Sequence, residues 1–594
     1  MVDRSTRLRW RRVFRRKQKQ VGNLGAQAEE NVDRLIIRRL GRLVNVKRFV
    51  AGWLLLVFLL LTVLVGQFRV LNRTWQSQQP VPGGIYTEGM LGTFTNANPL
   101  YATSLADSTV SRLLFPGLLS YDQHNSLKND LAESWSISKD NLKYTVVLRP
   151  NLTWQDGQPL TADDVVFTFR TAQNPDAKSP LFRSWNGVQI MAKDQRTVEF
   201  TLNTAFAPFP HSLTTGILPH HVLSNVPVSD LRSATFNTTG PIGSGPFAWS
   251  SVEQSSNGER EGEQQVGLTA SKSYYAGVPK LDGFVVHTYQ DQKLLERDFQ
   301  DKKITAIVGL DDVPEDLQKL PDTTNYEPVL SAQVMAFMRT DSKLLQSKQL
   351  RQALVYATNV PSVVNSLPDA VLVADSPLLR GQIGYDAKLV QYGYDKPRAE
   401  KILTKDGWKM QTSGIRHKES TDLTIRLVAQ STPRLKLVAE QLKQAWGAVG
   451  VDVSVNLLDE SEIQNAIHTR DYDVLLYGIS IGADPDVFPY WHSTQADPRS
   501  GSRLNFSDYA SDIADSALEA GRSRSDPTLR TAKYKPFLQA WQADAPAIAL
   551  YQPRFTYITN TPVFGFDTVE INAAGDRLED VANWQIRQAL RPQP

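Results

Sequence analysis

The chain has no cysteine among its 594 residues. This absence excludes disulfide scaffolds, thiolate metal sites, a cysteine nucleophile and a lipidated N-terminal cysteine. The sequence also lacks the G-x-S-x-G, H-E-x-x-H and Walker patterns, and its eight histidines show no metal-ligand spacing. We therefore expect no catalysis, no metal and no cofactor. The roughly 510 residues after the apolar run show no internal repeat.

The composition excludes two further classes of protein. Hydrophobic residues make up 41% of the chain and charged residues 21%, which are ordinary globular values. Neither a wholly disordered chain nor a membrane protein with many spans has such values. At about 150 residues per domain, the length suggests three to four structural units.

The small net charge of +3 conceals two regions of opposite sign. Residues 1–49 hold 15 Lys and Arg against 4 Asp and Glu, a balance of +11. The whole chain holds 65 basic and 62 acidic residues, so the remaining residues hold 50 basic and 58 acidic ones, a balance of −8. Directly after the basic block, residues 49–68 carry no charge in 20 positions. A helix of that length rises roughly 30 Å, the thickness of a hydrocarbon core.

A cleaved secretory signal is the alternative interpretation of this apolar run. However, the charged region before it is far longer than the basic segment of a signal, and no small-residue cleavage pattern follows. We expect a signal anchor: a basic cytoplasmic tail at 1–48, one transmembrane helix at 49–68 and a polar linker at 69–82, with the rest of the chain outside. The Arg-rich stretch 7–19 is expected to lie on anionic lipid and not on nucleic acid.

The remaining chain mixes strand and helix patterns. Residues 142–154 alternate and are rich in β-branched side chains, which predicts a strand and a turn. Two strands of a hairpin are predicted at 245–252 and 265–271, and the polar tract between them, 253–264, is expected to be a solvated tip. Residues 433–450 carry apolar side chains at helical spacing, end at a glycine and are followed by a strand pattern, which is typical of an α/β lobe.

The segment Leu131 to Arg170, LAESWSISKDNLKYTVVLRPNLTWQDGQPLTADDVVFTFR, resembles the signature of extracellular solute-binding proteins of the peptide/nickel family, which serve ABC importers. Other segments resemble the same family in its own order: LLFPGLLSYD (113–122), ILPHHVL (217–223), PIGSGPF (241–247), SYYAGVPKLD (273–282), LRQALVYATN (350–359), AEKILTKDGW (399–408), RDYDVLLYGISIGADPDVF (470–488) and DAPAIALYQP (544–553). One such segment would be weak evidence, but the ordered set is highly specific.

The resemblance implies an α/β fold of two lobes, a periplasmic-binding-protein-like clamp of the large peptide-binding type, preceded by one transmembrane helix. Lobe one would comprise residues 83–330, with 548–594 returning to it, and lobe two residues 331–547. The implied function is the membrane-anchored extracellular substrate-binding component of an ABC importer, which captures oligopeptides or similar solutes by hinge closure. Its implied partners are a permease and ATPase complex, and the anchor would replace the lipid tail of many relatives.

Most of the shared motifs are expected to be structural. Three carboxylates should form turns and helix caps: Asp156, Asp163 and Asp164. Gly243 and Gly245 should allow a close approach of backbone segments, and no phosphate loop is expected because no Gly-Lys-Ser/Thr follows. His220 and His221 are adjacent, so their side chains diverge, and we expect packing there and no metal.

The ligand contacts are expected where the lobes face each other. In peptide-binding relatives, an acidic residue three positions before the Asp-Pro pair holds the α-ammonium of the peptide, and here that position is Ile481. A buried ammonium without a counter-ion costs several kcal/mol, so Ile481 argues against the usual grip on a free N-terminus. Asp484 and Asp486 remain, and their alternative role is to form the DPD turn.

The residues expected to bind ligand are Thr93, Asn96, Asn98, Tyr101, Thr103, Trp185, Tyr477, Ser480, Ile481, Asp484, Tyr490 and Trp491. Most are neutral hydrogen-bonding groups or aromatic faces, which suits a neutral or extended ligand. Two alternatives stay open. One is another solute, such as an oligosaccharide (favoured by stacked aromatics), a nickel chelate or a haem (favoured by a basic cleft). The other is a surface sensor or scaffold without a transport role.

Overall fold

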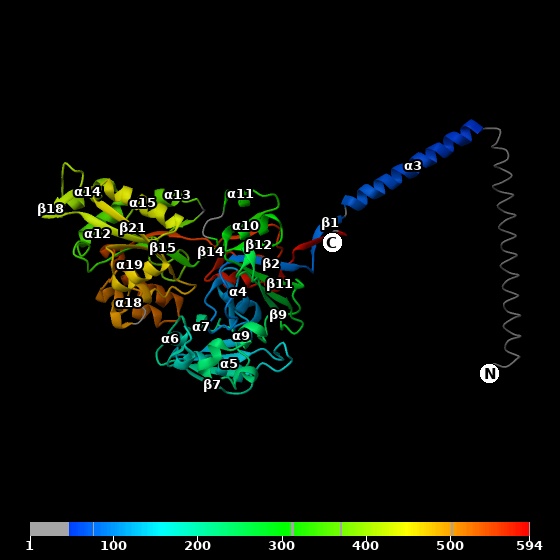
Figure 1. Cartoon of the computed structure of the whole chain (residues 1–594), viewed down its shortest axis with the longest axis horizontal. Helices are drawn as coiled ribbons and strands as arrows, with labels where there is room; N and C mark the ends of the chain where they lie inside the picture. Colours follow the sequence, from blue (N-terminus) through cyan, green and yellow to red (C-terminus); the bar gives the residue numbers. More distant parts are fainter. Residues whose placement is uncertain (1–46, 75, 311–313, 369–370, 501–502, 593–594) are drawn as a thin grey trace. The chain divides into compact units, whose positions relative to one another are not determined.

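In the computed structural model, the described residues are 47–74, 76–310, 314–368, 371–500 and 503–592 (Figure 1). They fall into two compact units. The smaller unit contains the N-terminal part up to Gln79 and the C-terminal residues from Gln588, and the larger unit runs from Pro80 to Arg587. The expected basic tail, 1–48, lies almost entirely outside the described residues.

The smaller unit contains a helix that is long and apolar enough to cross a membrane. Helix α3 spans Lys47–Thr74, and its stretch Phe49–Gln67 has a mean hydropathy of 2.7 and contains no buried residue. Strand β1 (Gln76–Val81) then pairs with β26 (Arg587–Pro592). Where the sequence predicted a linker, at 69–82, the structure has the end of α3 and β1, because residues 69–79 contain no glycine or proline.

The larger unit contains two principal sheets, one in each lobe. The first sheet has seven strands, in the order β13 (Thr324–Tyr326), β24 (Tyr557–Thr559), β12 (Ala306–Val308), β2 (Ile85–Leu91), β11 (Gly283–Tyr289), β10 (Gln264–Ala270) and β9 (Phe247–Gln254). The second has six, in the order β16 (Leu372–Val373), β23 (Ala547–Gln552), β15 (Ala332–Met338), β22 (Val474–Ser480), β20 (Thr424–Gln430) and β21 (Asp452–Leu458). Parallel pairs lie at the centre of the first sheet, where β2 pairs with β11 and β12.

Smaller sheets complete both lobes. The first lobe adds a four-stranded sheet of β5 (Ala132–Ile137), β6 (Lys143–Leu148), β8 (Thr197–Thr201) and β7 (Gln189–Ala192), and the pairs β3 (Leu119–Tyr121) with β4 (Leu127–Asn129) and β14 (Val329–Leu330) with β25 (Glu570–Ile571). The second lobe adds β17 (Lys409–Met410), β18 (Arg416–Lys418) and β19 (Thr421–Asp422).

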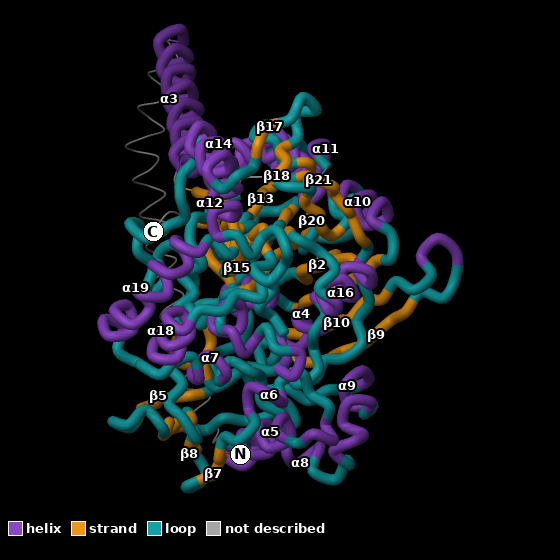
Figure 2. The backbone as a smooth tube through the Cα atoms, turned by 90° about the vertical axis from the view of Figure 1, so that its left-hand side faces the viewer, coloured by secondary structure: helices purple, strands orange, loops and turns teal. Residues whose placement is uncertain are grey.

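Helices cover the sheets of both lobes (Figure 2). Those described in the first lobe are α4 (Leu105–Leu114), α5 (Ala162–Gln173), α6 (Phe182–Trp185), α7 (Phe209–Ser212), α8 (His220–Leu223), α9 (Phe236–Thr239), α10 (Gln292–Gln300) and α11 (Glu315–Gln318). Those in the second lobe are α12 (Lys348–Ala357), α13 (Val360–Asn365), α14 (Lys396–Lys405), α15 (Pro433–Gly447), α16 (Glu460–Thr469), α17 (Phe488–Trp491), α18 (Asp512–Arg522) and α19 (Pro527–Asp544).

The chain passes between the two principal sheets twice. The first crossover is at the fully buried Ser331, between β14 and β15, and the second joins β23 to β24. Residues 548–552, which the resemblance assigns to lobe one, lie in β23, between β16 and β15 of the second sheet. All six residues of β23 are buried, and an apolar run does not indicate which of two sheets it joins.

Several local predictions are confirmed. The Asp164 carboxylate accepts the backbone N–H of Thr161 at 2.8 Å and caps α5. Helix α15 and strand β21 follow one another as expected, and β9 pairs antiparallel with β10. A Cβ on Gly243 would lie 2.1 Å from the carbonyl oxygen of Leu114, which confirms the close backbone approach.

The tip of the β9–β10 hairpin is less solvated than its polar sequence predicted. Glu263, at the end of this tip, is 4% exposed. Its carboxylate pairs with Arg260 at 2.9 Å and with His287 at 3.1 Å, and Arg260 also pairs with Asp298 of α10 at 2.7 Å. The ion pairs of Arg260 and the hydrogen bond between Glu263 and His287 hold the end of the tip against the first lobe, so the expectation of a solvated tip is wrong for Glu263.

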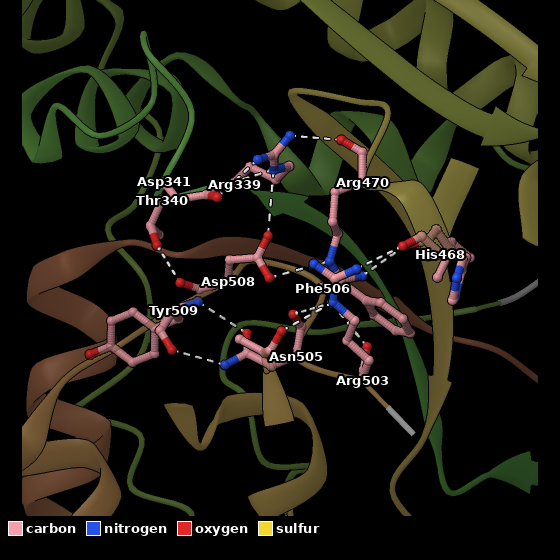
Figure 3. Close-up of polar contacts among 12 residues, drawn as sticks. Arg339, Thr340, Asp341, His468, Arg470, Arg503, Asn505, Phe506, Asp508 and Tyr509 are labelled. Atoms are coloured by element: carbon pink, nitrogen blue, oxygen red, sulfur yellow. Dashed lines mark hydrogen bonds and ion pairs between the residues drawn. The ribbon is translucent and has the colours of Figure 1, made fainter. Parts of the chain in front are cut away.

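A polar network fastens the loop 503–509 to the second lobe (Figure 3). The guanidinium of Arg470, 4% exposed, donates to the carbonyl oxygen of Asn505 at 2.8 Å and pairs with the Asp508 carboxylate at 3.2 Å. Arg339, which follows β15, donates in turn to the Arg470 carbonyl oxygen at 2.7 Å. The network lies at the end of β15 away from Ser331, so it supports the lobe and leaves the crossover end of the sheet free.

Candidate functional site

A cavity of about 890 Å³ is lined by residues of both lobes. The first lobe contributes Tyr121, Asn572 and residues within two segments, 181–188 and 202–215, which include α6 and α7. The second lobe contributes residues within the loop 481–489 and Arg522 at the end of α18. Figure 1 shows α6 and α7 next to α18, in agreement with this lining. A cavity with walls from two hinged lobes is a typical site for ligand capture.

The α6 wall is held in place by aromatic packing. Trp185 is 1% exposed and stacks on Phe169, with ring centroids 3.8 Å apart. Its edge also meets Phe209 of α7 at 5.6 Å. Because Trp185 is anchored in this way, its neighbours Arg183 and Ser184 lie exposed on the cavity wall.

The opposite wall begins where β22 ends. The backbone N–H groups of Ile481 and Gly482 both donate to the carbonyl oxygen of Ser331, each at 2.9 Å. Gly482 has φ +81°, a conformation that side chains other than glycine rarely adopt, and this lets the chain turn into the loop. The ligand-facing loop is therefore fastened directly to the crossover between the lobes.

Asp484 on this wall is neutralised by a neighbouring arginine. Arg530 of α19 donates through both terminal nitrogens to the two Asp484 carboxylate oxygens, and its side chain is 4% exposed. His211 of the first lobe lies 3.9 Å from the same carboxylate and 3.0 Å from the Tyr121 hydroxyl. Burial lowers the pKa of His211, against the pull of Asp484, so its imidazole is neutral at pH 7.

Asp486 is neutralised in the same way. Burial raises the pKa of Asp486, and the nearby Arg522, at 2.8 Å, opposes this rise. The Arg522 guanidinium also lies over the rings of Phe488, at 4.0 Å, and of Phe206 in the first lobe, at 4.9 Å. A backbone hydrogen bond of 2.8 Å from Ala207 to the Arg522 carbonyl oxygen adds a second contact between the lobes. Both aspartates of the DPD turn thus carry internal counter-ions.

A second cavity, of about 430 Å³, lies beside the end of β22 and is largely apolar. Its walls include Val334, Leu435, Tyr477, Gly478 and Tyr551. Strand β20 pairs with β22 only as far as Leu476, whereas β22 continues to Ser480. The last residues of β22 thus extend beyond β20, where an extended ligand has room to add as a strand.

The larger cavity offers groups for binding a solute. Among the described residues, no group of three or more histidine, aspartate and glutamate side chains is placed to hold a metal ion. The polar groups of the larger cavity are two carboxylates paired with Arg522 and Arg530, the exposed Arg183, a neutral histidine and uncharged amides and hydroxyls. These groups suit recognition by hydrogen bonds.

The family model of bacterial extracellular solute-binding proteins, family 5 (middle), matches residues 126–500. The chain belongs to this family. Among its relatives, the oligopeptide-binding protein AppA of Bacillus subtilis (strain 168) is 27% identical over 494 residues, which cover 80% of this chain and 87% of AppA.

Solved structures of the family share the two-lobed α/β fold. The structure of Bacillus subtilis AppA in complex with a nonapeptide matches with a TM-score of 0.67 and 25% identity, over 86% of this chain and 100% of that one. NikZ from Campylobacter jejuni, in complex with Ni(L-His), matches with a TM-score of 0.70 and 26% identity, over 84% and 99%. The solute-binding family thus includes proteins solved with quite different ligands.

The structure distributes the residues expected to bind solute over several places. Trp185, Ile481 and Asp484 line the larger cavity, and Tyr477 lines the second one. Ser480 is exposed, and its carbonyl oxygen accepts the hydroxyl of Tyr490 at 2.6 Å. Tyr477, Ser480, Ile481, Asp484 and Tyr490 come together around the end of β22 and the turn that follows it, whereas Trp185 lies on the facing wall.

The other expected residues lie elsewhere. Tyr101 and Thr103 line a separate hollow of about 380 Å³, and Thr93 is exposed and accepts a hydrogen bond from Gln290. Three are buried and line none of these cavities: Asn96, Asn98 and Trp491. The amide of Asn98 donates to Asn237, and that of Asn96 to the Arg232 carbonyl oxygen, so both amides act within the fold.

Sequence reasoning missed most of the first-lobe wall. Its polar members, such as Arg183, Asn186 and Asn203, belong to no motif and follow no periodicity. The counter-ions Arg522 and Arg530 were missed as well, because they lie 36 and 46 positions from the aspartates that they neutralise. Only the DPD turn itself carried a signal in the sequence.

Proposed function

We propose that the chain is the extracellular substrate-binding component of an ABC importer, anchored in the cell membrane by α3, which captures oligopeptides or similar solutes by hinge closure. The observation that carries this proposal is the cavity of about 890 Å³ with walls from both lobes. Membership of the solute-binding family and the AppA relative favour oligopeptides as ligands. The lobes divide at residues 330/331, as the resemblance implies, and between β23 and β24 at residues 553–556, and rotate about these crossovers.

The charges of the cavity define the ligand further. Asp484 and Asp486 are paired with arginines, and the position that grips a free peptide N-terminus in relatives is Ile481. A ligand ammonium would therefore find no unpaired carboxylate, and its desolvation would go uncompensated. Peptides with a blocked or remote amino group suit this site better than peptides held by their N-terminus.

Native mass spectrometry of the full chain in detergent, followed by denaturation, tests this function. The expected result is a ladder of co-purified peptides, whose masses also give the preferred length. A single mass of a sugar or metal chelate would keep the importer and replace its solute. A protein that is isolated empty and also retains nothing from peptide and sugar libraries would contradict the proposal and favour a sensor or scaffold.

The membrane arrangement is a separate part of the proposal. The balance of +11 in residues 1–49 favours a cytoplasmic N-terminus, a single span and an outer domain that meets the permease and ATPase complex from outside. Because the natural chain has no cysteine, single cysteines can be placed on either side of α3 in intact cells. A membrane-impermeant maleimide should label only the cysteine in the outer domain; labelling of the N-terminal one would contradict this orientation.

A further inference from the structure

The first-lobe wall of the larger cavity presents polar side chains without partners in the fold. These are Arg183, Ser184, Asn186, Asn203 and Thr204, all exposed. Within the part of the chain that the structure describes, none of the five side chains makes a hydrogen bond or ion pair. Polar side chains that gather on a cavity wall and are not used by the fold are available to a ligand.

A glycine brings the two segments of this wall together. Gly187 has φ +81°, and a Cβ there would lie 2.8 Å from the side-chain nitrogen of Asn203. Any larger residue would push the Asn203 amide away from the α6 segment. The glycine therefore lets the Asn203 amide lie against the segment that carries Arg183.

Arg183 is also the one charge of the cavity lining without a counter-ion among the described residues. The other charged side chains of the lining are Asp484, Asp486 and Arg522, and each has an opposite charge close by, with Arg530 serving Asp484. His211 is neutral at pH 7 because burial lowers its pKa. Because the paired charges cancel, the guanidinium of Arg183 gives the lining a net positive charge.

We propose that this wall is a carboxylate-binding subsite, in which Arg183 pairs with an acidic group of the bound solute. The proposal rests on the proposed function and deepens it by naming the ligand class. A guanidinium matches a carboxylate with two parallel hydrogen bonds, and the neighbouring amides and hydroxyls supply further donors. The carboxylate can come from the C-terminus of a peptide or from an Asp or Glu side chain, and both present the same chemistry to the wall.

The test uses the full chain in detergent and four pools of random pentapeptides without cysteine. The pools have a free or an amidated C-terminus, and each is made with or without Asp and Glu. The pools compete at pH 7, and bound peptides are counted by native mass spectrometry. Wild-type protein should prefer pools with a carboxylate by about tenfold over the amidated pool without Asp and Glu, the factor that one charge-assisted hydrogen bond supplies.

Three variants isolate the role of Arg183. Arg183→Gln should reduce the preference to less than about twofold, and Arg183→Lys should give an intermediate value because it keeps the charge and loses the planar fork. Lys139→Gln is the matched control: Lys139 is exposed, lies in the same lobe and is absent from the cavity lining. This control should keep the wild-type preference.

The outcomes separate the subsite from the function. A preference confined to the pools with a free C-terminus identifies the terminal carboxylate, and a preference that survives amidation when Asp and Glu are present identifies a side chain. Equal binding of all four pools, or a wild-type preference in Arg183→Gln, overturns the carboxylate subsite and leaves the peptide receptor intact. Wild-type protein that retains none of the pools contradicts oligopeptide capture itself, and the subsite fails with it.

Discussion

The two walls of the larger cavity use arginine in opposite ways. On the second-lobe wall, Arg530 and Arg522 pair with Asp484 and Asp486, and the Arg530 side chain is only 4% exposed. On the first-lobe wall, Arg183 is exposed and has no such partner among the described residues. The same residue type thus stabilises the fold on one side and remains available to the solute on the other.

This difference shows that a charged side chain in a binding cavity indicates the charge of the ligand only when its partners in the fold are known. A buried carboxylate next to its own guanidinium presents little net charge to a ligand. An exposed guanidinium in a cleft with low-dielectric walls acts more strongly than on an open surface. The charged residues of the DPD turn therefore say less about the solute than the polar residues on the facing wall.

Removal of Arg530 should have the largest effect on stability. Arg530→Ala leaves Asp484 buried without a counter-ion, and we expect the free energy of unfolding to fall by about 3–5 kcal/mol. Equilibrium unfolding in urea measures this change. Arg183→Gln, on the facing wall, is the control and should change stability by less than about 0.5 kcal/mol.

A double variant shows whether the loss comes from the unpaired charge. Asp484→Asn together with Arg530→Ala should be more stable than Arg530→Ala alone, because it leaves no buried charge uncompensated. If Arg530→Ala and Arg183→Gln lowered the free energy of unfolding equally, the two walls would not differ in how they use arginine.

Arg522→Ala should have the second largest effect. The substitution removes the ion pair with Asp486 and the cation–π contacts with Phe488 and Phe206, but the side chain is 26% exposed and its charge is partly screened. We expect a loss of about 2 kcal/mol in urea unfolding. Arg522→Lys keeps the charge and should recover part of it; a neutral result for the alanine variant would mean that this contact between the lobes contributes nothing.

Ile481→Asp should change selectivity more than stability. The new carboxylate would stand in the cavity lining where peptide-binding relatives grip the α-ammonium, so peptides with a free N-terminus should gain about tenfold over their N-acetylated forms. Competition between the two forms of one pentapeptide pool measures this. An unchanged ratio in a correctly folded variant would show that the N-terminus of the peptide lies elsewhere.

The smallest expected effect concerns pH. Because burial lowers the pKa of His211, the unfolded chain binds a proton at this residue before the folded protein does, and folding stability falls as the pH drops through about 6.5. His211→Asn, which removes a group facing Tyr121, Asp484 and Arg530, should reduce this slope by less than about 1.4 kcal/mol per pH unit. Urea unfolding at pH 7 and pH 5 tests the sign; a steeper slope in the variant would contradict it.

Features that depend on neighbouring residues were predictable from the sequence. The hairpin of β9 and β10, the cap of α5 and the succession of α15 and β21 follow from periodicity, turn residues and capping residues. The two-lobed fold followed from a resemblance that is distributed over the chain. In each case the signal is local or is repeated along the sequence.

Features that depend on distant pairs were not predictable. Asn98 resembles a ligand contact in sequence, but its amide is used by Asn237, 139 positions away. Glu263 resembles part of a solvated tip, but His287 and Arg260 draw it into the lobe. The residues of the first-lobe wall form no motif that the sequence could reveal. Their side chains are seen to have no partner in the fold only once the surrounding residues are known.

Distance measurements between the two lobes show whether the protein captures its solute by closing. Because the natural chain has no cysteine, Met191→Cys in the first lobe and Ile513→Cys in the second, both at exposed positions, can carry a fluorophore pair. We expect that solute eluted from the isolated protein shifts the population to shorter distances when it is added back to the emptied chain. A distance distribution that stays the same at saturating ligand would contradict capture by closure of the two lobes.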